Sequence, residues 1–385
     1  MATARPGAVI EVALGPCGDA LDDLVDVDFR LPGGGRRRVP AFSRAGQWVV
    51  RYAAAERGEH SYRGAGLPEA AGVLRIDGEP EPGLYATGGL RGAPGGRHLE
   101  TGAGVPFLWL ADTWWDALTD RVTDAEIAQL AAQRAGQGFS AIQLVAGLYP
   151  EMAPFSREGE SRSGWAWHPG FTSPNEAWFN DADTRVRLIV DHGLIPCIVG
   201  AWGFYLQHMT TDQMVRHWRE LIARWGAYPV VWCLAGEVTA LDYEQVLAAA
   251  ARLQNGRPGP GAIVKLAGRA VRQAVSSAGR SRPGGFPDSE RIATLLGLRS
   301  AVSEQVGRWT QVARAVRALE PYGRPFSVHP QPAWPPYNVI DDPSLFDFWL
   351  LQTGHSGYHT LAASVAQLEH ACRQRPRKPA IVGEV

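Results

Sequence analysis

Two glutamates, Glu237 and Glu384, stand at the ends of separate apolar segments, PVVWCLAGE and KPAIVGE. Each segment has the composition of a buried parallel strand, and such a strand delivers its last side chain to the edge where barrel folds carry their active sites. Two carboxylates facing one pocket can cleave a glycosidic bond, because one protonates the leaving oxygen while the other attacks the sugar or activates water. The sequence therefore predicts a two-carboxylate site, provided that the fold brings both strand ends together.

A single glutamate after a strand has a simpler interpretation, which is that it caps the helix that follows. Two of them, on the fourth and seventh strands of one series, favour catalysis. Burial or a like charge nearby raises the pKa of a carboxyl group, so such a pair can supply one protonated and one ionised group near neutral pH. A carboxyl separation of about 5–5.5 Å would indicate retention of configuration, and about 6.5–9.5 Å inversion.

The region after residue 100 alternates apolar strands with amphipathic helices. A capping box at Thr123 and Glu126 opens one predicted helix, and apolar residues between Met214 and Trp225 recur every 3.6 residues in another. Seven parallel strands are predicted, in PFLWLAD, SAIQLVAG, LIPCIVGAWG, PVVWCLAGE, PFSVHP, LFDFWLLQTGH and PAIVGEV. This alternation favours an α/β fold with a (β/α)8 TIM barrel over residues 96–385. No eighth strand is visible, which we interpret as truncation of a longer protein.

The first 95 residues differ in composition, with short β-strands and frequent glycine-rich turns. In LVDVDFRL, apolar residues alternate with Asp26, Asp28 and Arg30, as a half-buried strand requires. We predict a small all-β sandwich domain over residues 1–95, joined to the barrel by a linker near 91–98.

Residues 252–299 interrupt the strand–helix alternation with nine Lys and Arg against two Asp and Glu. A basic stretch can be a nucleic-acid-binding arm, but Phe286 is its single aromatic residue. We interpret the segment at about 252–300 as a surface insertion in the barrel. The net charge of −1 gives no electrostatic reason to expect nucleic acid or an anionic membrane as a partner.

Further candidates for the site are polar and aromatic residues at or just after the predicted strand ends. They are Asp112, Trp114, Trp115, Trp202, His329, Gln352 and His355. Indole rings can stack on sugars, although at least one of these tryptophans is expected in the core. Asp112 can bind a sugar hydroxyl or cap the turn that follows it. A long loop with Trp165, Trp167 and Trp178 is predicted over the barrel mouth, where it shapes or gates a subsite or merely covers the rim.

A metal-assisted hydrolase built on Asp112, His329 and His355 is the weakest alternative. The ten histidines include no HxH or HExxH spacing typical of a metal site. The four cysteines are far apart and form no CxxC motif, so free thiols are expected. We expect neither a metal nor a cofactor. Because the N-terminus has no signal-peptide h-region and no apolar run reaches about 20 residues, a cytoplasmic protein is predicted.

Four segments resemble the apiosidase-like (β/α)8 glycoside hydrolases, relatives of a large retaining clan: GRHLETGAGVPFLWLADTWWDAL, NEAWFND, GLIPCIVGAWG and VVWCLAGE. The segment VPAFSRAGQWVVRYAAAERGEHSYR resembles a small β-sandwich domain often found ahead of such barrels. The resemblance implies a retaining glycosidase that acts on a carbohydrate substrate. It also implies that Glu237 is the acid/base and Glu384 the nucleophile.

One position departs from the wider clan. There the acid/base follows an asparagine whose amide contacts the sugar 2-hydroxyl, whereas Gly236 precedes Glu237 in this chain. The resemblance therefore does not specify the sugar, and furanoses and pyranoses are both candidates. The alternative function is a carbohydrate-binding barrel that has lost its activity.

Overall fold

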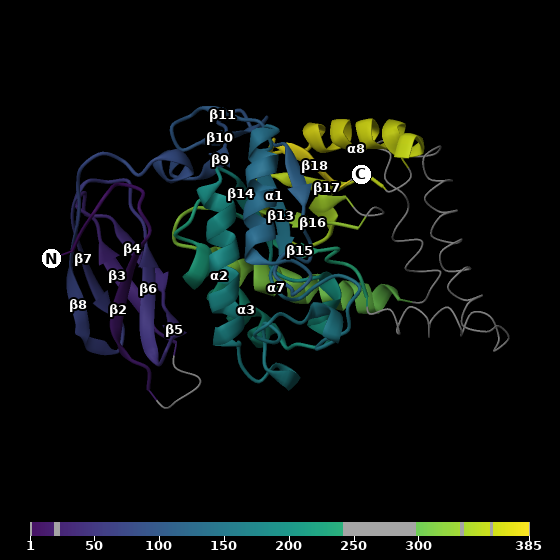
Figure 1. The fold of residues 1–385 in the computed structure, drawn as a ribbon. Coiled ribbons are helices and arrows are strands. Elements are labelled where there is room, and N and C mark those ends of the chain that lie inside the picture. Colours follow the sequence, from purple (N-terminus) through teal and green to yellow (C-terminus); the bar gives the residue numbers. More distant parts are fainter. Residues whose placement is uncertain (1, 19–23, 242–297, 332–334, 355–356, 385) are drawn as a thin grey trace.

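The computed structural model describes residues 2–18, 24–241, 298–331, 335–354 and 357–384. An N-terminal group of β-strands lies beside a larger region in which helices surround parallel strands (Figure 1). The segment predicted as an insertion, at about 252–300, lies almost entirely outside the described residues.

Eight strands between residues 2 and 76 form two sheets. The larger sheet has the order β1-β8-β7-β3-β4 and the smaller one β2-β6-β5. The bounds are β1 Ala2–Ala4, β2 Ile10–Pro16, β3 Asp26–Arg30, β4 Arg36–Pro40, β5 Phe42–Arg44, β6 Gln47–Tyr52, β7 Gly58–Gly64 and β8 Leu67–Ile76. Neighbouring strands are antiparallel except for β1 and β8, which are parallel.

Apolar side chains of both sheets share one core. On β3, Val27 and Phe29 are fully buried while Asp28 between them is exposed, which confirms the predicted alternation. Phe29 stacks on Tyr52 of β6 with ring centroids 3.8 Å apart, and Leu74 of β8 belongs to the same cluster. A core shared by two facing sheets is the packing of a β-sandwich.

A third antiparallel sheet, in the order β11-β10-β9, stands between the sandwich and the parallel strands in the chain. Its strands are β9 Leu90–Gly92, β10 Leu99–Thr101 and β11 Pro106–Phe107. The predicted linker near 91–98 is largely the turn between β9 and β10, closed by a hydrogen bond from the Ala93 amide to the His98 carbonyl oxygen. The domain division at residue 95 falls within this turn and stays a prediction.

Seven parallel strands are present in the predicted order, but the first is shorter than predicted, because only Ala111 and Asp112 of PFLWLAD lie in it and Pro106–Phe107 pair in the antiparallel sheet. The seven strands are β12 Ala111–Thr113, β13 Ala141–Val145, β14 Ile195–Val199, β15 Val231–Gly236, β16 Phe326–His329, β17 Trp349–Gln352 and β18 Ala380–Glu384. β12 to β16 form one sheet in sequential order, and β17 pairs with β18 in a second. β16 lies next to β17, because the Ser327 hydroxyl donates to the Phe348 carbonyl oxygen at 2.7 Å.

The predicted TIM barrel is realised only in part. Among the strands that the structure describes, β12 and β18 each have one hydrogen-bonded neighbour and do not pair with each other. A barrel of this type closes with eight strands, whereas seven are described here. The fold is therefore mixed α/β with an open parallel arrangement, and the expectation of a closed barrel is corrected.

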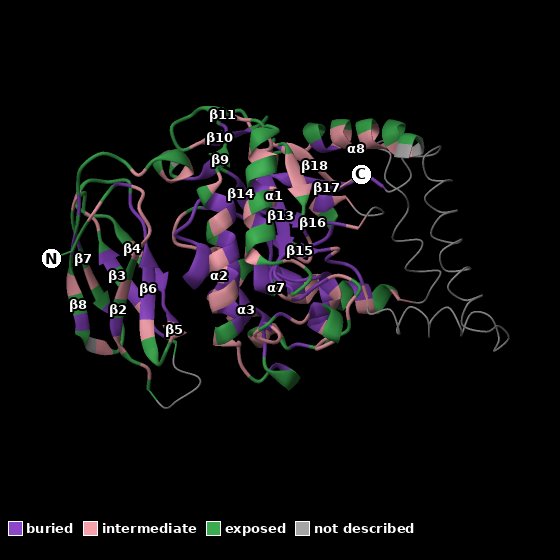
Figure 2. Ribbon diagram, viewed as in Figure 1, coloured by how far each residue is buried: buried purple, intermediate pink, exposed green. Residues whose placement is uncertain are grey.

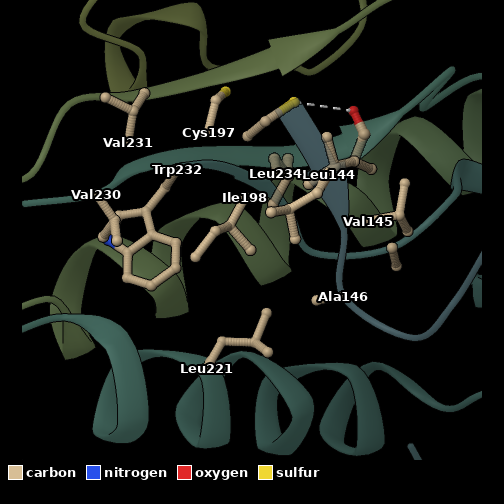
Figure 3. Packing of buried hydrophobic residues seen from close by; sticks show 14 of the residues in the cluster. Leu144, Val145, Ala146, Cys197, Ile198, Leu221, Val230, Val231, Trp232 and Leu234 are labelled. Atoms are coloured by element: carbon tan, nitrogen blue, oxygen red, sulfur yellow. Dashed lines mark hydrogen bonds between the residues drawn. The ribbon is translucent and has the colours of Figure 1, made fainter. Parts of the chain in front are cut away.

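The inner strands are buried on both faces. All residues of β13, β14 and β15 are buried (Figure 2), as their continuous apolar sequences require when helices cover both sides of a sheet. The helices are α1 Asp124–Gly136, α2 Glu176–Asp191, α3 Thr211–Trp225, α7 Arg299–Leu319 and α8 Leu361–Arg373. Figure 3 shows Ile198 and Trp232 of the strands packed above Leu221 of α3. Within the described ranges, no helix has both the length and the apolar character needed to cross a membrane.

The start of α1 confirms the predicted capping box. The Thr123 hydroxyl accepts a hydrogen bond from the Glu126 amide at 3.2 Å, and the Glu126 carboxylate accepts one from the Thr123 amide at 2.7 Å. α3 begins with the same device at Thr210 and Gln213. Because these bonds satisfy amides that the first helical turn leaves open, they fix where each helix begins.

A buried ion-pair network joins the sandwich to the helices. Asp183 of α2 accepts hydrogen bonds from Arg51 of β6 at 2.6 Å and from Arg224 of α3 at 3.0 Å. The indole of Trp225 donates to the same carboxylate at 2.8 Å. Burial raises the pKa of Asp183, but the charges of Arg51 and Arg224 outweigh it and hold this pKa below its ordinary value. The ionised carboxylate thus ties β6 to α2 and α3.

Candidate active site

The C-terminal ends of four neighbouring strands bring polar side chains to one edge of the parallel arrangement. Glu237 follows β15, and His329, Gln352 and Glu384 end β16, β17 and β18. The strand register places Gly236 opposite His329 and Gln352 opposite Glu384. The two glutamates therefore belong to the same site, although 147 positions of sequence separate them.

Each glutamate contacts one of the two intervening residues. The Gln352 Nε2 atom donates to Glu237 Oε1 at 3.3 Å, and His329 Nε2 lies 3.1 Å from Glu384 Oε2. His329 is fully buried, whereas the Glu384 side chain is 20% exposed. The site thus combines the buried side chains of His329 and Gln352 with two carboxylates that are each partly exposed.

The backbone of Glu237 leaves the strand in an unusual conformation. Its φ angle is 43°, in the left-handed region that side-chain-bearing residues rarely adopt. The carbonyl oxygen of Glu237 accepts a hydrogen bond from the Ala240 amide at 2.6 Å, which closes a tight turn. Such a conformation costs about 1–3 kcal/mol and persists where surrounding contacts hold it, as at many functional sites.

The surroundings of Glu237 favour its protonated form. Burial is the largest influence and raises the pKa of this carboxyl group. The charge of His329 and the hydrogen bond from Gln352 act in the opposite direction, while the charge of Glu384 raises the pKa further. The resulting pKa of Glu237 lies above the ordinary value for glutamate. A raised pKa is what a general acid needs near neutral pH.

Three aromatic rings line the same edge. Trp115 meets His329 edge to face with ring centroids 5.9 Å apart, and Trp202 lies 5.6 Å from Trp115. The centroids of Trp202 and His329 are 6.1 Å apart. Trp115 is half-buried, whereas only 7% of Trp202 is exposed. The rings pack around the buried imidazole, and Trp115 is the one that retains accessible surface.

Asp112 and Trp114 lie in a different environment. The Asp112 carboxylate accepts hydrogen bonds from Arg134 of α1 at 2.5 Å and from the Trp114 indole at 3.1 Å. Burial raises the pKa of Asp112, but these hydrogen bonds outweigh it and hold the pKa below the ordinary value. Asp112 also accepts a hydrogen bond from the Thr113 amide. This contact fits the expected role of Asp112 as a cap of the following turn better than a role in binding a sugar hydroxyl. The structure therefore ties these two residues to α1.

The long loop after β13 packs more deeply than predicted. Trp178 belongs to α2 and not to the loop, and both it and Trp167 are buried in the core. Trp165 is half-buried, and its indole donates to the Ser156 carbonyl oxygen. Trp167 donates to Nδ1 of buried His217 at 3.1 Å, and His217 Nε2 in turn faces the Gly200 carbonyl oxygen at 2.8 Å. Burial lowers the pKa of His217 to about 4, so it stays neutral and serves packing.

One candidate falls outside the described residues, and the metal hypothesis finds no support within them. His355 lies in the gap at residues 355–356. Across the part of the chain that the structure describes, no three His, Cys, Asp or Glu side chains gather as metal ligands would. His329 is turned toward Glu384 instead of Asp112.

Sequence reasoning missed two residues that hold the glutamate backbones. Gly203 lies so close to Glu237 that an added Cβ atom would stand 2.3 Å from the Glu237 carbonyl oxygen. The Thr353 amide donates to the Glu384 carbonyl oxygen at 2.9 Å. The glycines in GAWG were the available signal for close backbone approach, whereas nothing in the sequence distinguishes Thr353.

Comparisons with known proteins add a family and a fold. Residues 93–385 match the profile of a family described as apiosidase-like, catalytic domain. A protein of Bacteroides vulgatus ATCC 8482 assigned as a glycoside hydrolase has a similar structure, with 15% identity and a TM-score of 0.61 over 100% of this chain and 65% of that one. A family 5 glycoside hydrolase of the same organism has 16% sequence identity and a TM-score of 0.52, over 79% of this chain and 55% of that one.

This chain therefore spans less than two thirds of the length of both structures. At such low identities the likeness concerns the fold. A comparison with curated protein sequences found no match.

Proposed function

The chain belongs to the apiosidase-like glycoside hydrolases, and on this premise we propose that it hydrolyses a glycosidic bond with Glu237 and Glu384, retaining the anomeric configuration. One observation carries the proposal. The glutamates stand at the C-terminal ends of β15 and β18, and the residues that end the two strands between them, His329 and Gln352, contact Glu384 and Glu237 respectively. A pair of carboxyl groups is the equipment that this hydrolysis needs.

Glu237 is proposed as the acid/base because its surroundings raise its pKa. In the first step, protonated Glu237 donates its proton to the leaving oxygen as the bond from that oxygen to the anomeric carbon breaks. In the second step the resulting Glu237 carboxylate removes a proton from water, whose oxygen attacks the same carbon. Burial and the nearby charge of Glu384 both favour the protonated starting form.

Glu384 is proposed as the nucleophile because a basic side chain lies beside one of its oxygens, while the Glu384 side chain as a whole is 20% exposed. Its carboxylate attacks the anomeric carbon and forms a glycosyl ester, which water then cleaves. His329 Nε2, 3.1 Å from Glu384 Oε2, can orient the carboxylate and favour its ionised form.

The test is activity on a panel of aryl furanosides and pyranosides with Glu237→Gln and Glu384→Gln as paired variants. We expect both variants to lose at least about 10²-fold in kcat/KM. Proton NMR of the first anomer released is expected to show the configuration of the substrate. Full activity in both variants would overturn the two-carboxylate mechanism, and initial release of the opposite anomer would replace retention by inversion.

A second candidate is a carbohydrate-binding barrel without hydrolytic activity. The observation behind it is that β18, which carries Glu384, is only half-buried. Calorimetric binding of a glycoside that the protein leaves uncleaved would support this candidate. Turnover that disappears in Glu384→Gln would exclude it.

A further inference from the structure

We propose that Trp202 is a positioning residue for Glu237, which clamps the acid/base against its strand end, and not the sugar-stacking platform that its place in the sequence suggests. The inference rests on the proposed function of Glu237. It concerns a residue of the segment after β14 that acts on the end of β15. Three independent contacts carry it.

The first contact is the packing of the Trp202 ring on Gly236. A Cβ atom added to Gly236 would stand 2.2 Å from Cζ3 of this ring, so the indole occupies the space that any side chain before Glu237 would need. Trp202 and Gly236 also form a parallel bridge, and the Gly236 amide donates to the Ala201 carbonyl oxygen at 2.9 Å. The glycine before the acid/base is therefore paired with this tryptophan.

The second contact is between the Trp202 side chain and the Glu237 carboxyl group, where the indole acts as a donor that lowers the pKa of Glu237. An indole N–H can only donate, so it stabilises the carboxylate form and fixes the direction of one oxygen. Gln352 donates to the same carboxyl group from β17. The titratable groups that face Glu237 are His329 of β16 and Glu384 of β18.

The third contact holds the segment that carries Trp202. Gly203 packs its α-carbon against the Glu237 carbonyl oxygen, and the buried Trp309 of α7 donates its indole N–H to the Gly203 carbonyl oxygen at 3.0 Å. The Trp202 amide donates to the Leu148 carbonyl oxygen at 2.8 Å. Strand, loop and helix thus lock the left-handed Glu237 backbone between fixed neighbours.

Trp115 and Trp202, the two tryptophans at this edge, differ in how much of each ring is accessible. Only 7% of Trp202 is exposed, and its ring is enclosed by Gly236, Trp115 and His329. A buried ring has no free face for a sugar. Trp202 therefore acts on substrate only through Glu237.

The decisive variant is Trp202→Phe, which keeps an aromatic ring on Gly236 and removes the N–H donor. We expect kcat/KM to fall about 10- to 100-fold, as for loss of a hydrogen bond to a charged group. The basic limb of the pH profile is expected to move to higher pH, because the Glu237 carboxylate loses a stabilising donor. A basic limb that coincides with that of the unchanged protein would overturn the inference.

Trp178→Phe is the matched control. Trp178 is also a buried tryptophan, but its indole nitrogen has no hydrogen-bond partner among the described residues. This variant is expected to keep the basic limb in place. An equal displacement in both variants would assign the effect to general loosening of the core and overturn the role of Trp202.

Gly236→Ala tests the packing independently. The added methyl group is expected to displace the Trp202 ring, lowering activity at least as much as Trp202→Phe and moving the basic limb in the same direction. A Gly236→Ala protein with unchanged kinetics would contradict the packing contact.

A measurement that needs no substrate separates this inference from the proposed function. Carboxyl ¹³C NMR of glutamate-labelled protein, with Glu237→Gln used for assignment, follows the titration of Glu237 directly. We expect its midpoint to be higher in Trp202→Phe than in the unchanged protein and equal in Trp178→Phe. An unchanged midpoint in Trp202→Phe would overturn the inference, even if hydrolysis by the two glutamates is established. A raised midpoint in a protein without hydrolytic activity would support the contact while refuting the proposed function.

Discussion

The ends of β15 and β18 carry the same two residues, Gly followed by Glu, yet their surroundings differ. Every residue of β15 is buried, whereas every residue of β18 is half-buried. Glu237 accepts a hydrogen bond from Gln352, follows a glycine on which Trp202 packs, and has a left-handed backbone. Glu384 ends β18 just after a shift in its register with β17, and it contacts His329. Identical local sequence thus yields two chemically different carboxyl groups, because burial and neighbours set the protonation of each.

The largest expected effect separates the proposed roles of the two glutamates. Glu384→Gln is expected to lower kcat roughly 10⁴-fold for every leaving group, because no nucleophile remains. Glu237→Gln should cost about 10²–10⁴-fold with a poor leaving group, and much less in the first step with a dinitrophenyl group that needs no proton. Pre-steady-state kinetics would then show a burst of dinitrophenol in Glu237→Gln alone. A burst in Glu384→Gln would reverse the assignment.

His329 contacts one glutamate and acts electrostatically on the other, so its replacement tests whether the two environments are coupled. His329→Gln is expected to lower kcat/KM about 10- to 100-fold. The basic limb of the pH profile should move to higher pH, since the charge of His329 lowers the pKa of Glu237. His192→Gln, at the end of α2 and facing the Leu188 carbonyl oxygen, is the control and should leave the profile unchanged. A downward displacement in His329→Gln would contradict the coupling.

Gln352 donates to Glu237, and its backbone pairs with Glu384 in the sheet. Its replacement therefore tests whether a contact specific to Glu237 sets the difference between the two glutamates. Gln352→Leu removes the donor at similar volume and is expected to lower kcat/KM about tenfold. The basic limb should again rise, because the hydrogen bond lowers the pKa of Glu237 in the unchanged protein. Measured pH profiles check this, and an unmoved limb would show that the contact at 3.3 Å has no influence on the ionised form.

The smallest effect concerns stability. The pKa of Glu237 is raised in the folded state, so the folded protein loses stability as pH rises from the unfolded pKa through the folded one. Glu237→Gln removes this loss and is expected to increase the free energy of unfolding at neutral pH by roughly 0.5–2 kcal/mol. Urea unfolding should show the gain shrinking toward about pH 3, where Glu237 is protonated in both states. Glu384, with a 20% exposed side chain, should gain less on the same substitution; an equal gain would erase the comparison.

The parallel strands could be predicted because their evidence is local. The apolar runs that became β13, β14 and β15 are continuous in the sequence, and burial on both faces requires such runs. The helix start at Thr123 depends on contacts three residues apart. For the same reason, the positions of Glu237 and Glu384 at strand ends followed from the sequence alone. The closure of the barrel did not, because it depends on strand pairing over long distances.

The candidate site was predicted in outline and not in its contacts. Asp112 and Trp202 had similar positions in the sequence, at or near the end of a predicted strand, but they meet different partners. Arg134 of α1, 22 positions away, pairs with Asp112, whereas Trp202 packs on Gly236. Nothing in the local composition distinguishes these outcomes, since each depends on which segment the fold places opposite.

The sequence by itself determined the strand and helix segments, the glutamates at two strand ends and the aromatic residues near them. Those features arise from apolar periodicity and from side chains a few residues apart. The tertiary structure alone decided that Gln352 reaches Glu237 across 115 positions and that His329 faces Glu384 across 55. A pKa depends on burial and on every charge within a few ångströms, whatever their separation along the chain. The difference between the two carboxyl groups is therefore a property of the folded protein.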